Sequence, residues 1–296
     1  MKKFGKYIIG GALAILITML VLDFLYTKIY ETSFPRTKFQ YLRSFKNKNI
    51  DYIFIGSSRV ESGIIPSIIK EKTGKTALNL GFQAARLSDI YTIVQLISEF
   101  KIKCQRIFIQ VDYIYNMNGH SSIFKTQLMP FVRETKILKM YNERYSENTI
   151  LNYYIPFYRY CDNDLKIGFR EIFASLVHKE TNIIENNGYV GLYGNSTMMG
   201  GSLPNTILKS NSILDSIKVF VRRNNMDVVF YCAPFCKDMQ NQHYLLKLKS
   251  KIPGLLDFSK VIKEDTQFMN CNHLNDSGAK QFTENFIQQV LIRNEK

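Results

Sequence analysis

The chain has 296 residues, of which 46% are hydrophobic and 13% aromatic, and its formal net charge is +14 at pH 7. This composition excludes a disordered chain and predicts one large or two small domains with a sizeable packed core. The positive charge is spread along the sequence without a compact basic and aromatic module, so we expect no nucleic-acid partner.

The N-terminus has the pattern of a membrane anchor. Residues 1–6 contain three lysines, and residues 7–22 contain no charge. A helix over residues 7–26 would span about 30 Å, the thickness of a bilayer's hydrocarbon core. No small-residue cleavage site follows, so we expect an uncleaved signal anchor that contacts membrane lipid; a cleaved signal is the main alternative. The lysines predict a cytoplasmic N-terminus and an exported body, periplasmic or extracellular.

Residues 27–50 are expected to form a juxtamembrane stalk or an amphipathic helix, and the body that follows (residues 51–296) alternates strand and helix. Helical spacing recurs between the short apolar runs, as in the segment 85–100. This alternation predicts an α/β fold, a three-layer sandwich with a five-stranded, mostly parallel sheet of flavodoxin-like type. The expected strands are residues 52–55, 76–80, 106–111, 227–232 and 255–258.

A long insertion, residues 113–205, interrupts this alternation after the third strand. It contains a helical pattern at 165–177 and a Gly- and Asn-rich stretch at 186–201. Because it leaves the third strand at the carboxyl edge of the sheet, we expect it to form a cap over a site there.

The stretch DYIFIGSSRVESGIIP, residues 51–66, contains the candidate nucleophile, Ser58. A strand that turns sharply into a helix places its turn at the carboxyl edge of the sheet, where α/β folds bind ligands. Gly56 tolerates a tight backbone, and the first amides of the following helix can hold an oxyanion. Serine in such a turn also serves commonly as a helix cap, so this motif alone does not identify a catalytic site.

The candidate base is His273, on a short loop before the last amphipathic helix. In a doubly wound sheet this loop can lie at the same carboxyl edge as Ser58. A serine and a histidine that are far apart in sequence can therefore meet as nucleophile and base.

Three motifs together resemble the SGNH/GDSL hydrolase pattern. They are Gly-x-Ser ending at Ser58, Asn79-Leu80-Gly81 after the second strand, and His-Leu-Asn-x-x-Gly-Ala beginning at His273. The likeness covers residues 51–112 and 226–293. It implies that Ser58 is the nucleophile, that His273 is the base, and that the amides of Ser58 and Gly81 bind the oxyanion.

The sequence departs from this pattern at three positions. Ser57 replaces the aspartate of Gly-Asp-Ser, and Asp112 lies near the position of the oxyanion asparagine, where an ionised carboxylate cannot donate. Asn270 stands three residues before His273, where the family has an aspartate. Asn270 could orient the imidazole as a neutral amide, or Ser58 and His273 could work as a dyad. The sequence resembles a branch of membrane-anchored SGNH-like domains that modify cell-envelope polysaccharides.

Three further residues are candidates for substrate binding. Tyr158 and Arg159 lie in an aromatic cluster around Pro156, a composition that suits stacking on sugar rings and pairing with carboxylates. Arg59 follows the nucleophile and could hold a substrate anion. Each has a structural alternative: the cluster could be part of a core, and Arg59 could form an ion pair.

The remaining residues point to no metal and no cofactor. The five cysteines have no zinc-like paired spacing, and no phosphate-binding glycine loop is present. Cys232, Cys236 and Cys271 could be neighbours, as a disulfide or as free thiols.

The sequence therefore predicts a membrane-anchored serine esterase or O-acyltransferase that acts on acyl esters, such as acetyl esters, of envelope carbohydrate. The alternative is an SGNH-like scaffold with weakened catalysis that binds glycan or a membrane-bound acyltransferase partner.

Overall fold

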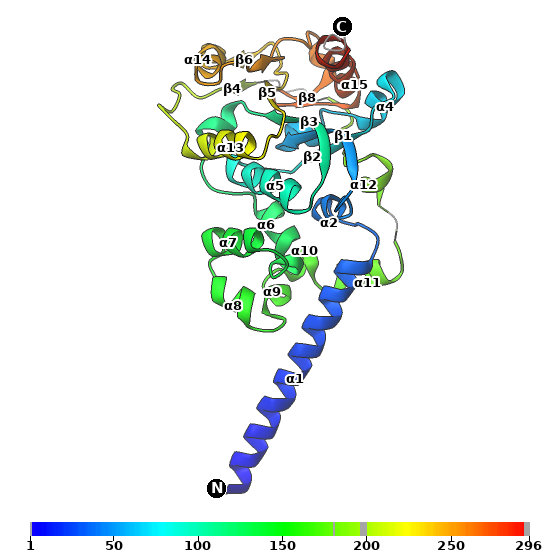
Figure 1. Cartoon of the computed structure of the whole chain (residues 1–296), viewed down its shortest axis with the longest axis vertical. Coiled ribbons are helices and arrows are strands. Elements are labelled where there is room, and N and C mark those ends of the chain that lie inside the picture. Colours follow the sequence, from blue (N-terminus) through cyan, green and yellow to red (C-terminus); the bar gives the residue numbers. More distant parts are fainter. Residues whose placement is uncertain (1, 180, 196–199, 293–296) are drawn as a thin grey trace. The chain divides into compact units, whose positions relative to one another are not determined.

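The computed structural model describes residues 2–179, 181–195 and 200–292 (Figure 1). The chain forms two compact units. Unit 1 comprises Met1–Gln40 and Lys125–Glu180, and unit 2 comprises Tyr41–Phe124 and Thr181–Lys296. The chain passes between the units three times: within α2 (Lys38–Arg43), within α6 (Ser122–Leu128) and between residues 180 and 181.

Unit 2 is built on a five-stranded sheet in the order β2-β1-β3-β5-β7. Every neighbouring pair in this sheet is parallel. The five predicted strands are confirmed, and the order is that of the flavodoxin-like doubly wound fold, whose ligands bind where the strand order reverses beside the first strand. The strands are β1 (Asn49–Gly56), β2 (Ala77–Gly81), β3 (Lys103–Gln110), β5 (Val228–Cys232) and β7 (Leu256–Asp257).

Helices cover both faces of this sheet, as the alternating pattern predicts. In Figure 1 the sheet lies between α5 with α13 and α4 with α15. The helices of unit 2 are α3 (Ser58–Glu61), α4 (Pro66–Thr73), α5 (Leu87–Glu99), α12 (Asn182–Glu185), α13 (Ser212–Arg223), α14 (His243–Lys251) and α15 (Asp276–Phe286), which continues as a π-helical turn, Ile287–Leu291. Two small sheets complete the unit: β4 (Gly201–Ser202) with β6 (Met239–Gln240), and β8 (Phe268–Asn270) with β9 (His273–Leu274).

Aromatic side chains fill the core between the sheet and α15. Phe54 and Phe108 are partners in register on β1 and β3, and their rings stack with centroids 4.9 Å apart. Phe286 of α15 packs edge-on against both rings, at 5.3 and 5.0 Å. Because side chains alternate along a strand, the neighbouring buried residues Ile53 and Ile107 point to the opposite face. Burial on both faces explains why these strands are almost continuously apolar.

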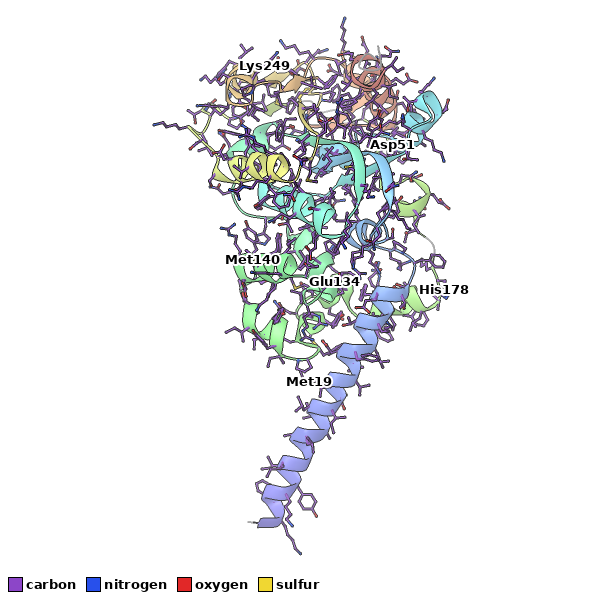
Figure 2. All side chains as sticks on the ribbon, viewed as in Figure 1. Met19, Asp51, Glu134, Met140, His178 and Lys249 are labelled. Carbon is purple, nitrogen blue, oxygen red and sulfur yellow. A yellow bond between two sulfur atoms is a disulfide. The ribbon has the colours of Figure 1, made fainter. Side chains whose placement is uncertain are left out.

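The described residues of unit 1 form helices joined by loops and include no strand. Its longest element is α1 (Lys2–Thr32), and it is the one helix in the described chain that is long and apolar enough to cross a membrane, by length and composition. Side chains N-terminal to the labelled Met19 project from the helix with no other element beside them (Figure 2). The other helices of the unit are α7 (Lys136–Tyr145), α8 (Thr149–Tyr154), α9 (Tyr158–Cys161), α10 (Asp164–Ile167) and α11 (Phe169–Leu176).

The structure assigns the segments around the predicted anchor differently from the sequence. Helix α1 continues to Thr32, so the first part of the predicted stalk is helical. The predicted insertion, residues 113–205, is shared between the units: residues 125–180 pack with α1 in unit 1, and the rest belongs to unit 2. That the insertion caps the site stays a prediction.

Candidate active site

The turn from β1 into α3 positions Ser58. A Cβ on Gly56 would lie 2.6 Å from Oε1 of Gln110 and 2.4 Å from Cγ2 of Val60, so this close turn requires glycine. Ser57 is the N-cap of α3, and its hydroxyl accepts a hydrogen bond from the backbone N–H of Arg59 at 3.3 Å. The cap stops the strand and starts the helix in one step, which leaves Ser58 half-buried as the first helical residue.

A short hairpin positions His273. Strands β8 and β9 are antiparallel, with Asn270 opposite His273. A disulfide between Cys236 and Cys271 ties this hairpin to the segment after β5. Asn275 then caps α15 by accepting a hydrogen bond from the backbone N–H of Gly278 at 3.0 Å. The histidine is therefore held by a strand pair, a covalent bridge and a helix cap.

The structure brings Ser58 and His273 together. Oγ of Ser58 lies 2.7 Å from Nε2 of His273, and Nδ1 of His273 lies 3.1 Å from Oδ1 of Asn270. Oδ1 of Asn270 also accepts hydrogen bonds from the backbone N–H groups of Asn272 and His273. Because an amide oxygen can only accept, its hydrogen bond with Nδ1 requires the proton on Nδ1. Nε2 is therefore the ring nitrogen that can accept the Ser58 proton.

The surroundings of His273 favour its neutral form. Burial, and next the positive charge of Arg59, lower the pKa of His273 from its ordinary 6.5 to about 4. At neutral pH the imidazole is therefore unprotonated and can accept a proton, but it is a weaker base than an imidazole beside a carboxylate.

The two predicted oxyanion donors differ in their hydrogen bonds. The backbone N–H of Ser58 has no acceptor among the described residues. The N–H of Gly81 donates to Oδ1 of Asn79 at 3.0 Å. Gly81 lies against α3, because a Cβ there would be 2.2 Å from the backbone nitrogen of Glu61. Both groups lie at the carboxyl edge of neighbouring strands, and the Ser58 amide is the one already open to a ligand.

Arg59 is a buried structural residue in this fold. Its guanidinium pairs with Asp112 at 2.9 Å, and both side chains are almost completely buried. It also donates to the backbone oxygens of Asn272, Ala233 and Pro234. Arg59 therefore links the Ser58 turn to the His273 hairpin, and we leave it out of the substrate-binding residues that we propose.

Gln110 and Asp112 extend this network below the Ser58 turn. Oε1 of Gln110 accepts hydrogen bonds from the backbone N–H and the hydroxyl of Ser57, both at 2.9 Å. The amide nitrogen of Gln110 donates to Asp112 at 2.6 Å. Asp112 is thus occupied as an acceptor for Arg59 and Gln110, which explains an aspartate at a position where an oxyanion donor was considered.

Part of the predicted insertion connects the two motifs. The backbone N–H of Val190 donates to the oxygen of Glu61, three residues after Ser58. The backbone N–H of Asp276, three residues after His273, donates to the oxygen of Leu192 at 2.7 Å. The segment around residues 187–194 therefore runs between the nucleophile and base segments within unit 2.

The other two predicted substrate-binding residues belong to unit 1. Tyr158 is half-buried at the start of α9. Arg159 is 1% exposed and pairs with Asp23 of α1 at 2.7 Å. The Arg159 guanidinium is thus engaged within unit 1, and we leave both residues out of the proposed site.

Two fully buried amide side chains support the site. They are Asn79 in β2, which the sequence motif contains but to which it assigns no role, and Gln110 at the end of β3. Asn79 donates to the backbone oxygens of Val60 and Ile64 and so holds the segment that follows Ser58. A lone buried amide at the carboxyl end of a strand must find partners, so such positions indicate a polar network.

No group of three or more His, Cys, Asp or Glu side chains in the described residues could hold a metal ion. Of the cysteines that do not form the disulfide, Cys232 is buried, and burial raises its pKa well above the ordinary value.

Comparisons with known proteins give little information on identity. No known family profile and no curated protein matches this sequence. Among solved structures, one described as "a putative platelet activating factor from Streptococcus pneumonia" is similar, with a TM-score of 0.36 and 11% identity over 94% of this chain and 98% of that one. A similarity at this level carries no argument here.

Proposed function

We propose that this protein is a membrane-anchored serine esterase or O-acyltransferase, with Ser58 as nucleophile, His273 as base and Asn270 as the residue that orients the base. The observation that carries the proposal is the 2.7 Å contact between Oγ of Ser58 and Nε2 of His273, with Nδ1 on Asn270. A positioned hydroxyl, base and orienting group are the elements of nucleophilic acyl transfer.

In the first step, Nε2 takes the hydroxyl proton while Oγ of Ser58 attacks the ester carbonyl. The Ser58 amide stabilises the oxyanion, and a donor of this kind contributes about 3 kcal/mol to lowering the barrier. Gly81 is a second donor if its N–H turns from Asn79 to the oxyanion. The tetrahedral intermediate expels the alcohol, which takes the proton from Nε2, and an acyl-Ser58 ester remains. Water or a sugar hydroxyl, deprotonated by Nε2, then attacks that ester. The second tetrahedral intermediate releases the carboxylic acid or the acylated sugar, and Oγ of Ser58 leaves and takes the proton back from Nε2.

The anchor and the compartment are part of the same proposal. Helix α1 crosses the membrane with Lys2, Lys3 and Lys6 on the cytoplasmic side. The Cys236–Cys271 disulfide suits an exported body, because disulfides persist in oxidising compartments. The substrate that we propose is an acyl ester of envelope carbohydrate, with acetyl as the first acyl group to test.

The test is turnover of an aryl acetate by the detergent-solubilised full chain. Wild type should hydrolyse the ester, whereas Ser58→Ala and His273→Ala should lose at least about a thousandfold in kcat. Ser62→Ala, a buried serine later in the same segment, is the control and should retain activity. Equal rates in wild type and Ser58→Ala would end the proposal.

A second function has a specific observation in its favour. Asn270 is neutral and the Gly81 amide is already bonded to Asn79, so the site lacks a carboxylate to stabilise an imidazolium and has one open donor. A scaffold that binds glycan or a membrane-bound acyltransferase without catalysis would tolerate both features. Glycan binding that survives Ser58→Ala, without ester turnover in wild type, would favour this alternative.

A further inference from the structure

Helix α8 in unit 1 has its polar and apolar faces reversed relative to a helix that packs on a core. Asn152 is 3% exposed, whereas Ile150 is 69% and Tyr154 is 61% exposed. Leu151 and Ile155 are also exposed. A helix at the surface of a soluble protein normally buries its apolar stripe. Helix α8 departs from this rule, because its apolar side faces outward.

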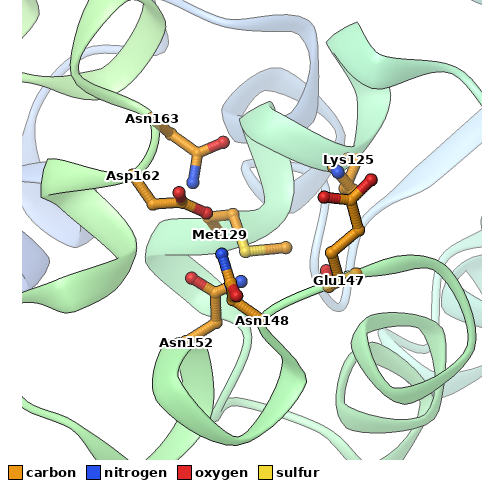
Figure 3. A pocket seen from close by; sticks show the side chains of 8 residues that line it. Lys125, Met129, Glu147, Asn148, Asn152, Asp162 and Asn163 are labelled. Carbon is orange, nitrogen blue, oxygen red and sulfur yellow. The ribbon is translucent and has the colours of Figure 1, made fainter.

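The inner, polar side of α8 faces a polar cavity. Figure 3 shows Asn148 and Asn152 converging with Glu147 and Asp162 around this space, which has a volume of about 240 Å³. Oδ1 of Asn152 is buried and has no hydrogen-bond partner among the described residues. The space is large and polar enough for water to satisfy that oxygen. Both faces of α8 are therefore reversed: its polar side chains face the interior of unit 1, and its apolar side chains face outward.

The α8 segment is fixed to α1 at one level, Asp23. The backbone N–H of Phe157 donates to Asp23 at 2.8 Å, and the Phe157 ring packs edge-on against Tyr26. Arg133 pairs with Asp23 at 2.8 Å and also donates to the backbone oxygen of Tyr153. Both ends of the segment 153–157 are thus tied to the same turn of α1, and Figure 1 shows α8 and α9 nearer than α11 to the N-terminal half of that helix.

Asp23 marks the end of the stretch of α1 that has no protein around it. It is the first buried residue of α1 among those described, and the side chains before it are mostly exposed and apolar. The predicted membrane span, residues 7–26, rises about 30 Å, which equals the hydrocarbon thickness of a bilayer. When α1 crosses the membrane, Asp23 lies within one turn of the point where the helix leaves the lipid.

We propose that the apolar face formed by Ile150, Leu151 and Tyr154 of α8, and by Ile155 directly after it, inserts into the lipid at the membrane interface beside α1. This inference rests on the membrane anchor of the proposed function. The adjacent groups suit that environment: the Tyr153 and Tyr154 rings lie 4.9 Å apart, and Lys139 lies over the Tyr153 ring. Tyrosines with nearby basic groups are typical of headgroup depth. The lipid contact gives unit 1 a second attachment, so this unit is held against the membrane surface.

The sequence contains no tryptophan, so a single introduced Trp reports its own surroundings. We would reconstitute full-length Tyr154→Trp and Ile150→Trp in phosphatidylcholine and phosphatidylglycerol vesicles, with and without bromine on the acyl chains. Leu13→Trp, on the exposed part of α1, is the positive control. Leu246→Trp, 71% exposed on α14, is the matched control in the other unit.

We expect brominated lipid to remove most of the emission of the variants at 150 and 154, with a blue-shifted maximum, and to leave the Leu246→Trp emission unchanged. Quenching of Leu13→Trp without quenching at 150 and 154 would overturn the inference and leave the anchor intact. The Tyr154→Trp emission could instead be shielded from aqueous acrylamide and not quenched by brominated lipid. That result would indicate that a protein or a second copy of the chain covers this face, and it would also overturn the inference. Absence of quenching at Leu13→Trp would remove the anchor and the inference together.

Discussion

Each compact unit contains a buried arginine paired with a buried aspartate, and the two pairs connect different parts of the fold. In unit 2, Arg59 pairs with Asp112 and reaches the backbone of Asn272, next to His273. In unit 1, Arg159 pairs with Asp23 and donates to Thr27, both on α1. The first pair fixes the distance between the nucleophile and base segments, and the second fixes α1 to the helices of its own unit. A buried arginine beside a functional motif can therefore be scaffolding, with no surface left for a substrate.

The largest effect that we predict is from breaking the pair in unit 2. Asp112→Ala leaves the Arg59 charge buried without compensation, which should cost about 3–5 kcal/mol in the free energy of unfolding. Hydrogen exchange should become faster in β1 and β3, and ester turnover should fall with it.

The same substitution in unit 1, Asp23→Ala, should accelerate exchange in peptides of α1 and α9 and leave the Ser58 chemistry intact. The exposed pair Arg106–Asp227 provides a control for both, since Asp227→Ala should cost less than about 1 kcal/mol. Unchanged exchange in β1 and β3 of Asp112→Ala would contradict the scaffolding role of Arg59.

The disulfide is the second attachment of the His273 hairpin, and its removal tests how much of the positioning depends on Arg59. Replacing Cys236 and Cys271 by serine should lower stability by about 2–4 kcal/mol and reduce kcat, because a less restrained hairpin holds His273 less often in place. Thermal unfolding and ester turnover measure the two effects. Cys161→Ser, at an exposed free thiol, should change neither. Full activity without the disulfide would show that the other attachments, Arg59 and the Asn275 cap among them, are enough to position the hairpin.

Asn270→Asp should sharpen the contrast between a neutral and a charged orienting group. An aspartate can accept the same three hydrogen bonds and also stabilises the imidazolium that forms when His273 takes the Ser58 proton. We expect kcat to rise by about ten- to a hundredfold, which corresponds to about 1.4–2.7 kcal/mol. Steady-state kinetics with an aryl acetate provides the measurement. A fall in kcat would mean that the neutral amide is required.

The pH dependence reports His273 directly. Because its pKa is lowered to about 4, the acid limb of kcat/KM should lie near pH 4, below the ordinary imidazole value of 6.5. Asn270→Asp should move that limb to higher pH.

Folding stability has a related dependence. The unfolded chain binds the His273 proton between pH 6.5 and 4 whereas the folded chain does not, so stability should fall as pH falls through that window. His273→Gln should remove this part of the pH dependence of stability.

An acid limb of kcat/KM at or above pH 6.5 would contradict the buried environment of His273 described here.

The strands and the encounter of Ser58 with His273 were predictable from sequence because they depend on local patterns and one topological rule. Apolar runs give the strands, and parallel strands bring their carboxyl ends to the same edge. The partners of Arg59 and Arg159 were not predictable, because each pair joins residues far apart in sequence through packing that no local pattern encodes. The composition of unit 1 was not predicted for the same reason: residues 125–180 pack with α1 (Lys2–Thr32), which lies far earlier in the sequence.

The split of the segment 165–177 into two helices has a local cause. Gly168 ends α10 in an extended conformation, and α11 begins at Phe169. A Cβ at Gly168 would lie 1.7 Å from the Asp164 carboxylate, so glycine permits this turn. The apolar periodicity continues through the break and indicates one helix where the structure has two.

The most direct test of the central claim is covalent labelling of Ser58. The detergent-solubilised full chain would be treated with a fluorophosphonate, and the modified residue located by intact mass and peptide mass spectrometry. Our account predicts one adduct on Ser58, its loss in Ser58→Ala, a strongly reduced rate in His273→Ala and a faster rate in Asn270→Asp. An unlabelled wild-type chain, or an adduct that remains in Ser58→Ala, would contradict the assignment of Ser58 as a nucleophile activated by His273.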